Sequence, residues 1–170
     1  TILAAQAEGT AESDGPEVRR CWLADDRDGL GGLTQAIDAA ALDTLVIQFN
    51  YGFFEFTAFG DFLMAQVQAG RVVVVMMHAT TDPVSHPQKR LSLLAPAFAR
   101  CHRILVHGPA DLNRLKALGL VNNVALFPHG IIDWTPAPTE ARVSDRDWLI
   151  ASYGFFLPHK GLPQLVEAIA

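Results

Sequence analysis

The sequence is poor in charge, and the charge that it has is not clustered. Charged residues make up 18% of the 170 residues, and the formal net charge is −5. Lysine and arginine are scattered, and no helix-length segment carries a basic face. Because a nucleic-acid-binding surface needs clustered Lys and Arg, the composition argues against nucleic acid as a partner.

Long hydrophobic runs and cysteines are also scarce. The longest apolar run, 72–77, is far too short to span a bilayer. The two cysteines, Cys21 and Cys101, lie far apart in the sequence, and each adjoins an expected strand. We therefore expect two buried free thiols rather than a disulfide, in a reducing compartment such as the cytoplasm.

The hydrophobic half of the sequence forms alternating strand and helix patterns. Apolar runs predict strands at 44–49, 71–77, 103–107 and 124–127. Helical spacing of apolar residues predicts helices at 33–42, 57–69, 88–100 and 109–118. The run 71–77 is continuously hydrophobic, which is typical of a parallel sheet covered on both faces. These patterns predict an α/β fold with a doubly wound, Rossmann-like parallel sheet.

A second unit is expected near the C-terminal end. The segment 133–147 is rich in charge and contains Pro136 and Pro138, as interdomain linkers do. A strand is predicted after it, followed by a turn at Gly154 and a helix from about residue 162. Such a turn directs backbone N–H groups and Lys160 toward a place where an anion fits. We therefore divide the sequence into a domain at 1–132, a linker at 133–147 and the beginning of a second domain at 148–170, and expect it to be a piece of a longer protein.

Four expected strands lead into unusual polar or aromatic segments, namely 50–56, 78–83, 128–131 and 154–161. If the sheet is parallel, these segments meet at one edge, where open α/β sheets bind their ligands. Each has a purely structural alternative. Asn50 and Gly52 suit a turn, as does the pair His129 and Gly130. Phe53 suits a hydrophobic core, His78 a structural role at a strand end, and Lys160 a solvated helix start.

Metal and nucleophile motifs are weak. His78, Asp82 and His86 are spaced four residues apart, but Pro83 and Pro87 interrupt any helix that would align them. No G-x-S-x-G segment occurs. We expect neither a metal site nor a cofactor.

Taken together, the four strand ends resemble the retaining, nucleotide-sugar-dependent glycosyltransferases of the GT-B architecture, group 1. The segment 153–161, YGFFLPHKG, resembles the family's strand, glycine turn and P-x-K-G motif. VVVMMH at 73–78 resembles its "vvvtlH", and VALFPHGI at 124–131 resembles its "vxviPHGv". RILVHGPA at 103–110 and QFNYGFF at 48–54 are similar to two further segments. The resemblance covers roughly 44–170.

The resemblance implies roles for particular residues. Lys160, with Gly154 and Gly161, would hold the diphosphate of the nucleotide-sugar donor. His78 would face the acceptor in the interdomain cleft and act as the catalytic residue. The acceptor would be bound by Asn50, Tyr51, Gly52, Phe53, His129 and Gly130. Phe155 stands where an arginine is frequent, and Asn50 where a glutamate often stands.

The resemblance therefore implies a hexosyltransferase-like enzyme of carbohydrate biosynthesis that acts with retention. Domain 1–132 would be its acceptor-side half. The donor would be a nucleotide sugar, and the acceptor a glycan, a lipid-linked or a small molecule, with peripheral membrane contact left open. A first strand with a glycine-rich turn would precede Thr1, and an E-x7-E donor motif would follow Ala170, so that the chain alone should be inactive.

Two alternatives remain open. The first is a degenerate, non-catalytic domain of the same type, used for binding or assembly, which the residues at Asn50 and Phe155 favour. The second is a nucleotide-sugar epimerase of the same architecture, which would need a pair of carboxylates in the cleft. Glu55 and Asp82 are the candidates for that pair.

Overall fold

In the computed structural model the chain forms two compact units, Thr1–Gly130 and Ile131–Ala170. The structure describes residues 1–6, 14–23, 29–130, 133, 150, 152 and 161–169. The predicted linker, the strand after it, Gly154 and Lys160 therefore lie outside the described residues, apart from 133, 150 and 152. Helix α5 (Leu162–Ile169) is the described element of the second unit and follows Gly161, whose φ is 72°.

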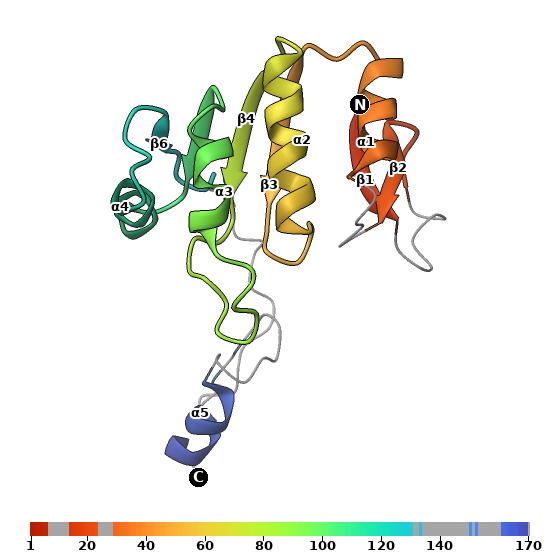
Figure 1. The fold of residues 1–170 in the computed structure, drawn as a ribbon. Coiled ribbons are helices and arrows are strands. Elements are labelled where there is room, and N and C mark those ends of the chain that lie inside the picture. Colours follow the sequence, from red (N-terminus) through yellow and green to blue (C-terminus); the bar gives the residue numbers. More distant parts are fainter. Residues whose placement is uncertain are drawn as a thin grey trace. The chain divides into compact units, whose positions relative to one another are not determined.

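The first unit is an α/β fold with a Rossmann-like, all-parallel sheet, as predicted (Figure 1). Its four-stranded sheet has the order β3-β4-β5-β6, and a two-stranded parallel sheet is formed by β1 and β2. The strands are β1 (Ile2–Gln6), β2 (Val18–Leu23), β3 (Thr44–Phe49), β4 (Val72–Met77), β5 (Arg103–Val106) and β6 (Val124–Leu126). The helices are α1 (Gly31–Ala39), α2 (Phe56–Gln68), α3 (Leu91–Phe98) and α4 (Pro109–Ala117). Strands and helices expected from 44 to 126 are confirmed, with bounds that differ by a few residues.

Helix ends follow from local chemistry. The Glu55 carboxylate caps α2 by accepting a hydrogen bond of 2.8 Å from the Ala58 N–H. Pro109 opens α4, where its missing N–H costs nothing. Gly70 and Gly119 follow α2 and α4 with φ near 80°, a conformation that glycine adopts without strain.

One continuous core joins the helices to one face of the sheet. Alternate strand residues, among them Phe49, Val75 and Ile104, are fully buried, and all four helices contribute to the same cluster. Phe59 of α2 lies at its centre, with ring centroids 4.3 Å from Phe54 and 5.6 Å from Phe49. Strand residues on the other face are more accessible, since Val46 is 58% and Val72 39% exposed.

That difference corrects one expectation from the sequence. The apolar run at 71–77 predicted coverage of both faces, but burial along β4 alternates residue by residue. In the described part of the chain, α1 to α4 cover a single face. The continuous hydrophobicity of β4 therefore exceeds what these helices bury.

The cysteine prediction is confirmed in its main point, because Cys21 and Cys101 are both free. Cys101 is 3% exposed, and burial raises the pKa of its thiol to about 11. Cys21 is half-buried in β2, against which α1 packs. A Cβ at Gly32 would lie 2.2 Å from the Cys21 carbonyl oxygen, so this approach requires glycine.

Replacing Phe59 tests the aromatic core. Phe59 is fully buried, so Phe59→Ala should lower the free energy of unfolding by about 3–5 kcal/mol in urea denaturation. Phe53→Ala is the matched control, because Phe53 is 46% exposed, and it should cost about 1 kcal/mol or less. Equal losses in the two variants would contradict this description of the core.

Candidate functional site at the carboxyl edge of the sheet

The parallel register brings the ends of the four strands to one edge. Phe49 pairs with Met77, and Met77 pairs with Val106, which in turn pairs with Leu126. The segments after these residues therefore emerge side by side, as expected for an open α/β sheet. Three of them carry a histidine within three residues of the strand end.

His78, His107 and His129 form a cluster of rings at this edge. The ring centroids of His107 and His129 are 3.7 Å apart and nearly parallel. The His78 ring lies 5.2 Å from His107 and 6.4 Å from His129. Within the described residues, no three His, Cys, Asp or Glu side chains are grouped as metal ligands. The cluster presents the exposed rings of His78 and His129 beside the half-buried ring of His107.

Hydrogen bonds assign tautomers to two of these rings. The His107 Nδ1 lies 2.9 Å from the Phe127 carbonyl oxygen, which can only accept, so Nδ1 carries a proton. The His107 Nε2 is buried and has no hydrogen-bond partner in the described part of the chain. The His78 Nε2 lies 2.6 Å from Gln48 Oε1, an acceptor as assigned, so Nε2 donates and Nδ1 is left as the basic nitrogen.

The environment keeps His78 neutral. Burial is the largest influence and lowers the pKa of His78, and the neighbouring His107 and His129 lower it further. His78 is nevertheless solvent-exposed just after the end of β4. Its main-chain N–H donates to the Phe49 carbonyl oxygen at 3.1 Å. A neutral, accessible imidazole can exchange a proton with a bound hydroxyl near pH 7.

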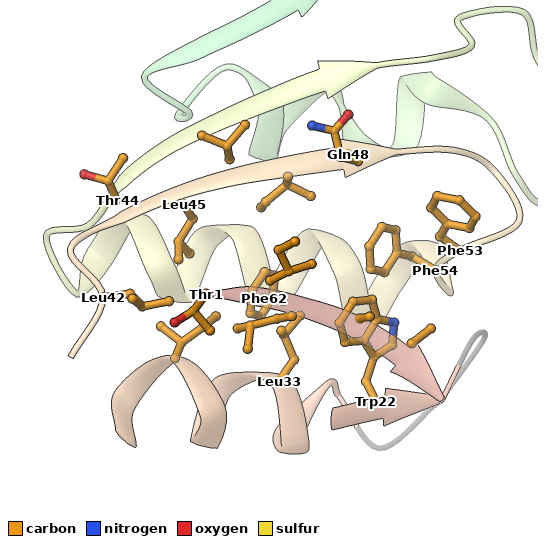
Figure 2. Close-up of a pocket in the computed structure, with 17 residues that line it drawn as sticks. Thr1, Trp22, Leu33, Leu42, Thr44, Leu45, Gln48, Phe53, Phe54 and Phe62 are labelled. Atoms are coloured by element: carbon orange, nitrogen blue, oxygen red, sulfur yellow. The ribbon is translucent and has the colours of Figure 1, made fainter. Parts of the chain in front are cut away.

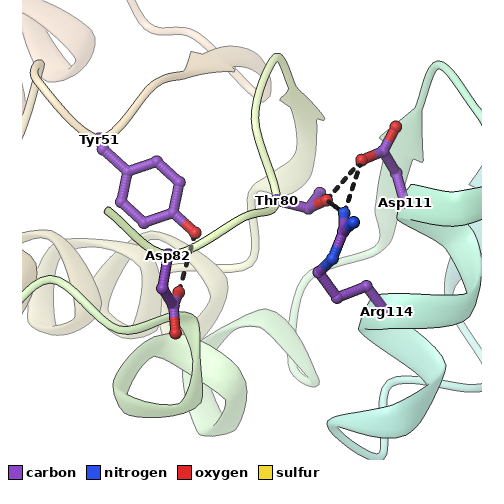
Figure 3. Close-up of polar contacts among 5 residues, drawn as sticks. All are labelled: Tyr51, Thr80, Asp82, Asp111 and Arg114. Carbon is purple, nitrogen blue, oxygen red and sulfur yellow. Dashed lines mark hydrogen bonds and ion pairs between the residues drawn. The ribbon is translucent and has the colours of Figure 1, made fainter. Parts of the chain in front are cut away.

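The loop that begins with His78 is fixed to the neighbouring β3–α2 loop through Asp82 (Figure 3). The Tyr51 hydroxyl donates to Asp82 Oδ1 at 2.9 Å, and the Leu91 N–H at the start of α3 donates to the same oxygen at 2.9 Å. Lys89 Nζ donates to the Tyr51 carbonyl oxygen at 2.7 Å. Burial, with Asp82 next in importance, raises the pKa of Tyr51, so the phenol stays a donor.

A second contact fixes the same loop to α4. Thr80 is 3% exposed, and its hydroxyl donates to Asp111 Oδ1 at 2.5 Å (Figure 3). Arg114 Nη1 donates to the Thr80 oxygen and, at 3.0 Å, to Asp111 Oδ1. Together, Asp82 and Thr80 hold the segment next to His78 from two sides.

The predicted acceptor-side residues have diverse surroundings. Asn50 and Gly52 form a turn, because Asn50 Oδ1 accepts from the Gly52 N–H at 3.3 Å. The Tyr51 ring is 8% exposed and packs on Phe49 and Phe56, so Tyr51 supports the edge from within. Phe53 is exposed and lines a groove beside β3. His129 and Gly130 are exposed at the edge.

Of the three residues predicted to hold the donor, the structure describes Gly161. Gly154 and Lys160 lie outside the described residues. The Gly161 carbonyl accepts from the Leu165 N–H at 2.9 Å and so begins α5.

Sequence reasoning did not single out His107. It was included in the predicted strand at 103–107 and in the segment RILVHGPA without a role of its own, although it follows β5 as His78 follows β4. The recurrence of histidine after successive parallel strands was the signal that could have identified it.

Comparisons with models of protein families, with curated proteins and with solved structures gave no match. Among the described helices, none has the length and hydrophobicity needed to cross a membrane.

Replacing Thr80 tests the contact between the His78 loop and α4. Thr80→Val keeps the shape but leaves Asp111 and Arg114 without the hydroxyl, so the free energy of unfolding should fall by about 1–3 kcal/mol. Thr81 is exposed, so the control variant Thr81→Val should change the free energy of unfolding by less than about 0.5 kcal/mol. Chemical denaturation of both variants measures the difference, and a Thr80→Val variant as stable as Thr81→Val would refute the contact.

The surroundings of His78 predict that the stability of the fold depends on pH. Because its folded pKa is lowered, His78 binds fewer protons in the folded than in the unfolded state, so its contribution to stability declines as the pH falls through the unfolded value near 6.5. NMR titration should show a His78 midpoint below 6.5, and His107→Gln should raise that midpoint. His86→Gln is the control and should leave the His78 midpoint unchanged. A midpoint that does not respond to His107→Gln would contradict the coupling.

Proposed function

We propose that the protein is a retaining glycosyltransferase of the GT-B type that uses a nucleotide-sugar donor, and that unit Thr1–Gly130 is its acceptor-side half. The observation that carries the proposal is the exposed, neutral His78 at the carboxyl edge of a parallel sheet, beside His107 and His129. The order and spacing of the sequence motifs from 44 to 170 add support. A cytoplasmic location and a glycan, lipid-linked or small-molecule acceptor belong to the same proposal.

In this proposal the imidazoles bind and orient sugar hydroxyls. His78 accepts a hydrogen bond at Nδ1 while Gln48 holds its Nε2 proton. Lys160 and the N–H groups at the start of α5 stabilise the diphosphate as negative charge develops on it, which is the larger electrostatic contribution.

The epimerase alternative loses support from the structure. Its candidate carboxylates already have structural partners, because Glu55 caps α2 and Asp82 accepts from Tyr51 and Leu91. The non-catalytic alternative keeps one supporting observation. Asn50, where a glutamate often stands in the resembling family, closes a turn with Gly52 and offers no acid or base.

The proposal is tested in the protein expressed from its complete gene. Release of nucleoside diphosphate is measured with UDP-glucose, UDP-N-acetylglucosamine and GDP-mannose. His78→Gln should lower kcat by about 100-fold without lowering Tm, because it removes the basic nitrogen. His86→Gln, on the same loop, should retain full turnover.

A second variant in the same assay probes the donor side. Lys160→Ala should lower turnover by about 100-fold, a loss of about 3 kcal/mol of transition-state stabilisation. Donor binding without turnover in the unmodified protein would favour the non-catalytic alternative. Full activity of both His78→Gln and Lys160→Ala would reject the proposed site.

A further inference from the structure

One polar side chain interrupts the apolar strand β3 just before its end. Between Leu45 and Phe49, Gln48 is the only polar residue, and it is exposed. Its Oε1 atom lies 2.6 Å from the Nε2 atom of His78. We propose that Gln48 is the positioning residue of His78, and that its neutral amide fixes both the orientation and the protonation of this imidazole. The proposal rests on the proposed function and adds to it the group that prepares His78 for the reaction.

Strand register places the two side chains on one face of the sheet. Gln48 pairs with Met76 in the parallel ladder of β3 and β4. The ladder continues to His78, whose main-chain N–H donates to the Phe49 carbonyl oxygen. Because side chains alternate along a strand, Met76 and His78 project from the same face, whereas Phe49 and Met77 are buried on the face that the helices cover. Gln48 and His78 are therefore diagonal neighbours on the face opposite the helices.

The Gln48 amide is directed away from the hydrophobic core. Figure 2 shows Gln48 near the carboxyl end of β3, with its amide on the side of the strand opposite Leu45 and Phe62. Leu45 and Phe62 both belong to the buried core. Within the part of the chain that the structure describes, the amide has no hydrogen-bond partner besides His78. Removing the amide should therefore change the surroundings of His78 without opening a cavity in the core.

The choice of an amide has a consequence for the charge of the ring. An amide oxygen accepts a hydrogen bond from Nε2, whereas a carboxylate at the same place would also stabilise the imidazolium. His107 and His129 are the titratable groups whose rings lie beside His78. Burial first, and then these two rings, lower the pKa of His78. Gln48 orients the ring and leaves this lowering in place, so that Nδ1 is free to accept a proton near neutral pH.

Imidazole nitrogen NMR tests the contact without any substrate, in the protein expressed from its complete gene. In the unmodified protein, neutral His78 should carry its proton on Nε2, because the amide oxygen accepts there. Gln48→Met is similar in length but has no amide, and it should shift His78 toward a mixture of the two tautomers. A proton on Nδ1 in the unmodified protein, or an unchanged tautomer in Gln48→Met, would overturn the proposal.

A change of charge at the same position tests the effect on protonation. Gln48→Glu should raise the titration midpoint of His78 by about 1 pH unit or more, because a carboxylate beside Nε2 favours the imidazolium. Gln68 is exposed at the end of α2, so Gln68→Glu is the matched control and should leave the midpoint unchanged. Equal midpoints in the two variants would show that Gln48 does not lie against His78 and would overturn the proposal.

Steady-state kinetics show whether the positioned imidazole is used. Gln48→Met should lower kcat by about 10-fold with little change in KM, which is part of the roughly 100-fold loss expected without the ring. Gln48→Glu should move the acidic limb of the kcat/KM profile to higher pH together with the NMR midpoint, and activity should recover at high pH. A purely structural role would not produce this recovery.

The same assay distinguishes failure of this proposal from failure of the proposed function. Full turnover of Gln48→Met beside an impaired His78→Gln variant would overturn the role of Gln48 and leave the function standing. Full turnover of His78→Gln would instead reject the proposed role of His78 in catalysis. In that case the two NMR measurements still decide whether Gln48 sets the orientation and protonation of the ring.

Discussion

Burial of Phe49 is the constraint on which the carboxyl edge depends. Phe49 is the last residue of β3, is fully buried, and contacts the rings of Tyr51, Phe56, Phe59 and Phe98. Its carbonyl oxygen accepts from the His78 N–H. The ring of Phe49 thus packs in the aromatic core with side chains of α2 and α3. Its main-chain carbonyl fixes the position of the His78 backbone at the end of β4. Because the core is close-packed, a shift of this ring would be transmitted to the edge.

Polar groups at the edge divide into those that hold the loops and those that remain available to a ligand. Asp82, Thr80, Asp111 and Glu55 all have donors or acceptors within the protein, so their role is to position loops and helix ends. His78 differs, because it is exposed and its Nδ1 has no partner among the described residues, whereas the unpartnered His107 Nε2 is buried. The carboxylates of this edge thus hold loops and helix ends, whereas the exposed His78 imidazole does not.

The strands of both parallel sheets share one physical requirement, which concerns their edges and their faces. A parallel strand needs partners along both edges and cover on both faces, since its unpaired N–H and C=O groups and its apolar side chains are otherwise hydrated. Among the described strands, β4 and β5 have partners on both sides, whereas β1 and β3 each have a partner on one side only. The continuous hydrophobicity of 72–77 exceeds what the described helices bury, because burial along β4 alternates residue by residue.

The sequence by itself determined the fold class, the strands and helices between 44 and 126, and the free cysteines, because apolar periodicity and glycine or proline signals act locally. It also indicated that His78 and His129 lie at one edge. Only the tertiary structure decided that His107 joins them and that Tyr51 is buried against Asp82. These outcomes depend on strand register and on contacts between residues about 20 to 30 positions apart, such as Tyr51 with Asp82. No local pattern encodes such contacts, since parallel pairing joins segments through long crossovers.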